Sequence, residues 1–151
     1  MTTPTLAEFA QLAGADHNYC VIATTRENGT IQASVVSAGV MRHPAGDADA
    51  VVCVAIGGSR KLANLRVRAA ATVVAGNAGA WITVEGRAQH NGPDDPRPGV
   101  DPARLRQLLR DAVRAAGGTH DDWDTYDRVM AEERRVAALV EPAHIYGFAE
   151  A

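Results

Sequence analysis

Short β-branched and apolar runs, each ended by a tight turn, are the feature that most constrains how this chain can fold. Residues 19–25 (YCVIATT) lead to Asn28-Gly29, a dipeptide that favours a two-residue β-hairpin, and the run 31–41 returns from it. Short turns join neighbouring antiparallel strands, whereas parallel strands need long crossovers. The pattern therefore predicts six antiparallel strands, at 19–25, 31–41, 50–56, 70–76, 81–90 and 136–148.

Helical spacings occur in three places around these strands. An amphipathic helix is predicted at residues 6–13, a short one after Ser59, and a helical pair in an insertion at about 102–134. The length of 151 residues is that of one domain, and no linker divides the chain. We expect a single α+β domain over residues 1–151, mainly β, built as a six-stranded antiparallel Greek-key barrel with peripheral helices. Such a barrel has little interior space, so a large ligand would lie outside it, in a groove shared with another chain or beneath the helices.

The run 31–41 begins with strict alternation of two kinds of residue. Positions 31, 33 and 35 are apolar and share one face, while Gln32, Ser34 and Val36 share the other. We interpret Gln32 and Ser34 as an exposed pair. They are either ordinary solvent-facing residues or hydrogen-bonding partners for a heterocycle.

Composition excludes several classes of function. The net charge of -3 argues against a general nucleic-acid binder, and no apolar run approaches the ~20 residues of a membrane helix. The N-terminus lacks the basic and apolar regions of a secretory signal. Cys20 and Cys53 both lie in apolar runs, which favours buried reduced thiols and a cytoplasmic location. The sequence alone leaves a disulfide between them as the alternative.

The segment 57–66 (GGSRKLANLR) contains Lys61, the only lysine beside fourteen arginines. Ser59 is the predicted N-cap, so Arg60 and Lys61 fall in the first turn, where the helix dipole disfavours cations. Either these charges are solvated at a cost of roughly half a kcal/mol, or they bind a phosphate or carboxylate together with free backbone N–H groups. The glycines at 57 and 58 would let such a ligand approach the backbone closely.

Other candidate residues give weaker signals. The stretch 119–127 is rich in His and Asp but matches no metal-ligand spacing, and it is typical of a helix cap that begins at Thr119. No histidine pairs with a cysteine at zinc spacing, so we predict no metal site. Trp81 begins a strand and is either a core residue or an aromatic that covers a flat ring. No nucleophile motif is present, and the sequence names no catalytic residue.

Four segments, in their order, resemble the flavin/deazaflavin oxidoreductase superfamily of split β-barrels, which includes the pyridoxamine-phosphate-oxidase-like FMN-binding proteins. They are VIATTRENGTIQASVVSAG, GGSRKLANLRVRAAATVV, WITVEGRAQ and DDWDTYDRVMAEERRVAALVEPAHIYG. The last segment, with the Lys-x-x-Asn-Leu core of Lys61, Asn64 and Leu65, is similar to the actinobacterial branch that uses the deazaflavin coenzyme F420.

The resemblance implies a homodimer with two cofactor sites at the subunit interface. It implies that the region of Lys61 binds the cofactor phosphate and that Trp81 approaches the site from the second subunit. The chain differs from many relatives at Ser59 and Ala63, where they carry arginine. The residues that the resemblance assigns to cofactor binding are Lys61, Ser59, Arg60, Asn64, Gln32, Ser34, Val36 and Trp81.

The expected activity is that of an F420-dependent oxidoreductase. It would transfer a hydride between reduced F420 and an unidentified small electron-poor acceptor. Two alternatives stay open: an FMN-dependent enzyme similar to pyridoxamine 5'-phosphate oxidase, and a non-catalytic carrier of F420.

Overall fold

The predicted antiparallel barrel is confirmed by a computed structural model, which describes residues 3–149. Six strands close in the order β1-β2-β3-β6-β5-β4, and every pair is antiparallel. No helix within the described range is long and apolar enough to cross a membrane. The elements are α1 (Leu6–Gly14), β1 (Tyr19–Thr25), β2 (Ile31–Arg42), β3 (Asp49–Ala55), α2 (Arg60–Val67), β4 (Ala70–Gly76), β5 (Ala80–Asn91), α3 (Pro102–Ala115), α4 (Trp123–Glu132) and β6 (Val136–Ala149).

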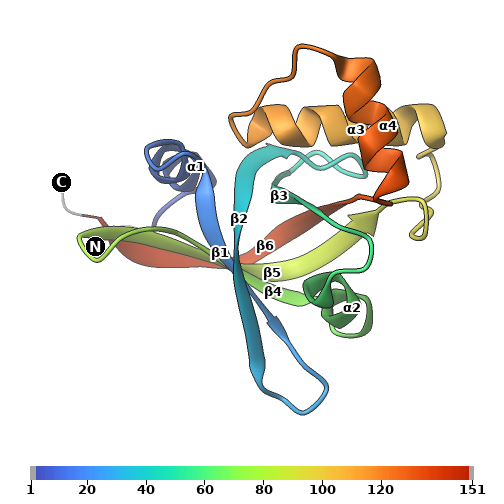
Figure 1. The fold of residues 1–151 in the computed structure, drawn as a ribbon. Helices are drawn as coiled ribbons and strands as arrows, with labels where there is room; N and C mark the ends of the chain where they lie inside the picture. Colours follow the sequence, from blue (N-terminus) through green and yellow to red (C-terminus); the bar gives the residue numbers. More distant parts are fainter. Residues whose placement is uncertain (1–2, 150–151) are drawn as a thin grey trace.

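Two apolar clusters hold the fold together. One fills the barrel, where Phe9 of α1 packs among inward-facing strand residues such as Ile22 and Val84. The other lies outside the barrel, where α3 and α4 pack over β3 and β6 (Figure 1). Strand β3 contributes to both clusters through alternate residues, as its continuous apolar sequence predicts. Because side chains fill the interior, the barrel leaves a ligand only its outer surfaces and ends.

Close contact between α3 and β2 depends on a glycine. A Cβ atom at Gly39 would lie 2.0 Å from the carbonyl oxygen of Ala115, the last residue of α3. The helix therefore rests directly on the strand, and α3 and α4 are held above the end of β2.

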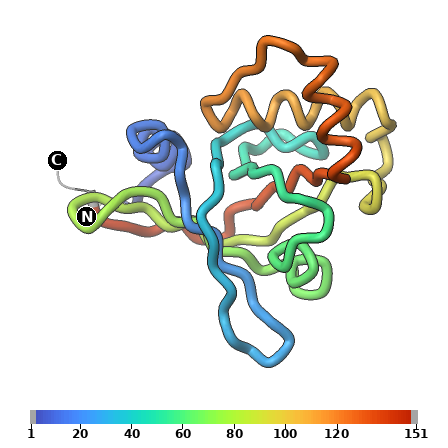
Figure 2. The backbone as a smooth tube through the Cα atoms, in the orientation of Figure 1, coloured from blue at the N-terminus to red at the C-terminus, as the bar shows by residue number. Residues whose placement is uncertain are grey.

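The predicted orientation of β2 is wrong. Gln32 and Ser34 pair with Thr24 and Ile22 of β1, so they share the barrel-facing side of the sheet and are half-buried. The apolar residues of the alternation face outward, and Val35 is 67% exposed. Alternation shows that two faces differ, but strand pairing decides which face points inward. The β1–β2 hairpin, blue to cyan in Figure 2, extends from the barrel with this apolar side uncovered.

One boundary near the C-terminus also differs from the prediction. Helix α4 is capped by Asp122 instead of Thr119, because the Asp122 carboxylate accepts a hydrogen bond of 3.1 Å from the backbone N–H of Thr125. The last strand, β6, is continuous through Pro142, because a register shift between Glu85 and Gly86 of β5 accommodates the proline.

Candidate functional site

A cavity of about 390 Å³ lies between the start of α2, the middle of β2, the end of β3, and the pair α3 and α4. Lys61 and Ser59 line it from α2, and Val36 lines it from β2. Its other wall is mostly apolar and comes from the helices above, with Val113 and Met130 among its residues. The cavity thus joins a polar corner to an apolar wall.

The polar corner contains unused hydrogen-bonding groups. Ser59 is the N-cap residue, as predicted, with extended backbone angles (φ -70°, ψ 151°). Its side chain makes no capping hydrogen bond, and its Oγ is buried without a partner among the described residues. The first N–H groups of any helix also lack partners within that helix. This end of α2 therefore presents several donors that nothing in the described chain satisfies.

The charge of the cavity is positive. Lys61 and Arg135 line it, and no carboxylate is among its lining residues. Lys61 forms no ion pair with any residue between 3 and 149. Burial raises the pKa of the Cys53 thiol to about 11, and the nearby Lys61 ammonium opposes that rise. Lys61 therefore lies near Cys53, and no carboxylate of the described chain is paired with it.

Arg135 is a site residue that the sequence analysis missed. It follows α4, and its guanidinium pairs with Glu133 at 2.9 Å. It reaches the start of α2 because Gly57 N–H donates to the carbonyl of Glu133 at 3.2 Å. A Cβ atom at Gly57 would lie 2.7 Å from the Arg134 carbonyl oxygen, so this glycine serves chain packing, whereas Gly58 has open space around it.

Gln32 and Asn64 belong to a polar chain beside the cavity. The buried Asn64 side chain donates to Thr24 Oγ1 at 3.1 Å, and Thr24 Oγ1 donates to Gln32 Oε1 at 3.2 Å. This chain ties α2 to β1 and β2. Asn64 and Arg60 line a different cavity, of about 630 Å³, so the two adjacent cations of α2 face different spaces.

The remaining predicted residues, Ser34 and Trp81, are not among the residues that line the cavity of Lys61. Ser34 lies two residues before Val36 on the same strand face, and its Oγ is buried without a partner in the described chain. Trp81 packs edge-on against Tyr146, with ring centroids 6.1 Å apart and planes at 86°. These two rings lie on the outer side of the β5–β6 pair.

The residues present fit an anionic group attached to an apolar ring. Two cations, free helix N–H groups and the buried Ser59 hydroxyl suit a phosphate. The aliphatic wall suits a flat ring. Tyr126 also lines the cavity, but its hydroxyl donates to the Leu109 carbonyl at 2.8 Å, and burial raises its pKa. Tyr126 therefore does not supply a free proton donor to the cavity. The other lining residues are suited to binding a ligand.

Comparisons with solved structures agree on the fold. A conserved hypothetical protein from Mycobacterium tuberculosis aligns with a TM-score of 0.68 at 15% identity, covering 97% of this chain and 85% of that one. A pyridoxamine 5'-phosphate oxidase-related, FMN-binding protein from Nostoc punctiforme aligns at 0.63 and 14% identity, covering 96% and 84%. A protein described as an F420 reductase aligns at 0.57 and 16% identity, covering 84% and 87%.

Sequence comparison places the chain in a family. No curated protein matches it. The family described as pyridoxamine 5'-phosphate oxidase matches residues 3–146, which is nearly the whole chain. The chain therefore belongs to the pyridoxamine 5'-phosphate oxidase family, with its split-barrel fold.

Proposed function

We propose that this protein is an F420-dependent oxidoreductase that transfers a hydride between reduced F420 and a small electron-poor acceptor. The observation that carries the proposal is the cavity at the start of α2, which has two cations and no carboxylate in its lining. The similarity to a solved F420 reductase and the Lys-x-x-Asn-Leu core favour F420 as the cofactor.

Each part of the cavity has a role in this proposal. Lys61, Arg135 and the first N–H groups of α2 hold the phosphate, and the Ser59 hydroxyl donates to it. Val36 and the apolar wall of α3 and α4 contact the ring and exclude water. When bound, reduced F420 supplies the hydride, so the chain's task is binding and orientation.

We also propose that the protein is a homodimer whose second copy completes the site. The strand register aligns Val35 on β2 with Val21 on β1 and Val74 on β4, and it pairs Trp81 on β5 with Phe148 on β6. Val35, Val21 and Phe148 are 67%, 42% and 43% exposed, and exposed apolar residues gathered in this way are typical of a protein interface. It would bring Trp81 of one copy toward the cavity of the other.

A cytoplasmic location is part of the same proposal. Cys20 and Cys53 are both buried and free, and the reducing cytoplasm keeps such thiols unpaired.

The second candidate is an FMN-dependent oxidoreductase. FMN also carries a phosphate and a flat ring, and the FMN-binding protein from Nostoc punctiforme has the same fold. A non-catalytic carrier of F420 would use the same cavity.

Fluorescence titrations with F420 and with FMN, side by side, test these candidates. We expect tighter binding of F420, and we expect Lys61→Ala to weaken it by about 1.5 to 3 kcal/mol, the worth of a charge-assisted hydrogen bond. Arg60→Ala is the matched control, because Arg60 is the adjacent cation but lines the other cavity. Equal losses in both variants would contradict the assignment of Lys61.

Turnover then separates an enzyme from a carrier. Reduced F420 is mixed with the protein and a panel of quinones, enones and nitro compounds, and the return of oxidised-coenzyme absorbance is followed. Binding without turnover of any acceptor would favour the carrier. Tighter binding of FMN than of F420 would favour the flavin enzyme.

A further inference from the structure

A second, larger cavity lies at the other end of α2. Its volume is about 910 Å³, within the range of small-molecule sites. Leu65 and Arg66 line it from the last turn of α2, and residues 43 and 45–49 line it from the loop between β2 and β3. The last part of β5 and the loop that follows it form most of the remaining wall, to which Ala69 and Glu141 also contribute. None of its lining residues lines the cavity of Lys61.

His90 of β5 lines this cavity and is an unsatisfied buried group. Its side chain is 6% exposed, and its Nδ1 atom has no hydrogen-bond partner within the described chain. Burial is the largest of the effects that lower the pKa of His90, and the charges of Arg97 and Arg66 act in the same direction. A neutral imidazole has one donor and one acceptor nitrogen. With the imidazole proton on Nε2, the buried Nδ1 atom is an acceptor that lacks a donor within the described chain.

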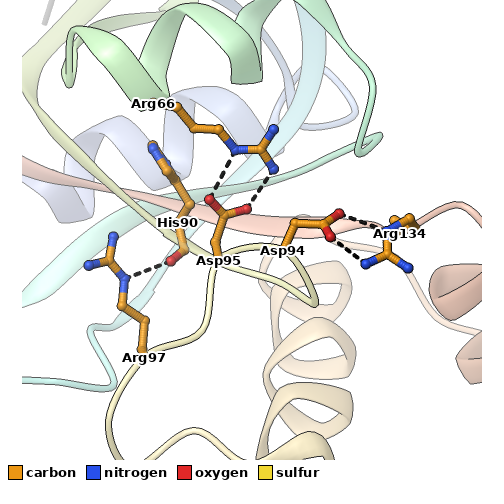
Figure 3. Close-up of polar contacts among 6 residues, drawn as sticks. All are labelled: Arg66, His90, Asp94, Asp95, Arg97 and Arg134. Carbon is orange, nitrogen blue, oxygen red and sulfur yellow. Dashed lines mark hydrogen bonds and ion pairs between the residues drawn. The ribbon is translucent and has the colours of Figure 1, made fainter.

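Arginines beside His90 are held in place with part of each guanidinium unused (Figure 3). Arg97 Nε donates to the His90 carbonyl at 2.9 Å, and Arg66 forms a two-bond pair with Asp95 at 3.0 and 2.7 Å. The preceding residue of the loop, Asp94, pairs with Arg134. Two ion pairs thus fix the loop after β5, and the terminal nitrogens of Arg97 have no hydrogen-bond partner among residues 3–149.

The other polar residues of the wall are mostly acceptors. Asp47 and Glu141 line the cavity and form no ion pair with any described residue. Gln89 is half-buried beside His90. Carboxylates disfavour a bare polyanion, but they accept hydrogen bonds from hydroxyl groups. The wall therefore combines a guanidinium for one anionic group with several acceptors for hydroxyls.

We propose that this cavity is a second ligand site, which binds a hydroxylated organic anion of the sugar-acid or sugar-phosphate class. Arg97 binds the anionic group, and Arg87, which forms no ion pair among residues 3–149, lines the same cavity. His90 Nδ1, Asp47 and Glu141 accept hydrogen bonds from the hydroxyls. The site is independent of the proposed cofactor cavity.

Calorimetric titration of the full chain with four probes tests this site. Gluconate and glucose 6-phosphate carry both the anion and the hydroxyls, hexanoate carries only the anion, and glucose carries only the hydroxyls. We expect gluconate or glucose 6-phosphate to bind at least about tenfold more tightly than either control probe. The tighter of the two identifies the anionic group. Failure of both to bind, or equal binding of hexanoate or glucose, would overturn the proposal.

Four variants locate the site. Arg97→Gln should weaken binding of the tighter probe about tenfold or more, while Arg104→Gln, on the exposed side of α3, should leave it unchanged. His90→Phe should weaken binding about fivefold without lowering the thermal midpoint of the ligand-free protein, because it removes an unsatisfied buried atom. Equal binding by Arg97→Gln and Arg104→Gln would contradict the assignment. Lys61→Ala should leave gluconate binding unchanged, which separates this site from the cofactor cavity.

Discussion

At the scale of single residues, Lys61 and Arg135 show what a sequence can and cannot reveal. Lys61 could be singled out because it is the only lysine and falls in a helix's first turn. Arg135 could not, because its place in the cavity depends on the packing of Gly57 against residues 133 and 134, which no local pattern encodes. The same limit separates Arg60 from Lys61, since only the helix orientation shows that they line different cavities.

Asn64 is expected to stabilise the fold through its hydrogen bond to Thr24, in addition to its place beside the cavity. Asn64→Leu leaves the Thr24 hydroxyl without its donor in a buried position, so we expect a loss of about 1 to 3 kcal/mol in the free energy of unfolding. Urea unfolding measures it. The double variant Asn64→Leu, Thr24→Val removes both partners and should recover part of the loss. A double variant less stable than Asn64→Leu alone would contradict this account.

The buried thiols predict an alkaline loss of stability. Burial raises the pKa of Cys20 from 9.0 to about 12 and that of Cys53 from 9.0 to about 11. Above pH 9 the unfolded chain loses these protons while the folded chain keeps them. The free energy of unfolding should therefore be undiminished below pH 9 and fall as the pH rises toward 11, by up to about 1.4 kcal/mol per pH unit for each thiol.

Urea unfolding at a series of pH values checks the prediction. The double variant Cys20→Ala, Cys53→Ala is the control, and its stability should depend much less on pH in this range. An equally steep fall in the control would show that other groups are responsible.

At the scale of elements, the helix starts have different functions. Asp101 caps α3 with a hydrogen bond of 2.8 Å to the backbone N–H of Arg104, whereas Ser59 makes no capping bond. We therefore expect Asp101→Ala to cost about 1 kcal/mol of stability and Ser59→Ala less than about 0.5 kcal/mol. Ser59→Ala should nevertheless weaken F420 binding, because the variant lacks the hydroxyl that donates to the phosphate in the proposed complex. Thermal unfolding and fluorescence titration of both variants measure the two effects. A large stability loss without an affinity loss would assign Ser59 a purely structural role.

Elements themselves were predictable where local signals are strong. The strands at 19–25 and 70–76 match the extents of β1 and β4, and each β-branched run is followed by turn residues, Asn28-Gly29 after β1 and Gly76-Asn77 at the end of β4. The inward face of β2 was not predictable, since Ile31 and Val35 look like core residues until their pairing with β1 is known. An apolar face that points outward is typical of a surface that contacts another protein.

At the scale of the whole molecule, the outward face of β2 predicts self-association. Val35→Glu should convert the proposed dimer into a folded monomer, because it places a charge in an apolar interface. Val67→Glu is the matched control, since Val67 is 73% exposed but belongs to α2 and not to the sheet. Sedimentation velocity measures the mass of each variant, and circular dichroism checks folding. A dimeric Val35→Glu variant, or a wild-type monomer, would contradict the proposed interface.

The central claim is that the start of α2 binds the phosphate of the cofactor. A crystal structure of the protein with F420 tests it most directly. We predict that the phosphate lies within hydrogen-bonding distance of Lys61 Nζ and Ser59 Oγ, with Arg135 beside it and the ring against the wall of α3 and α4. A phosphate bound anywhere else, with Lys61 turned away or paired to a carboxylate, would contradict it.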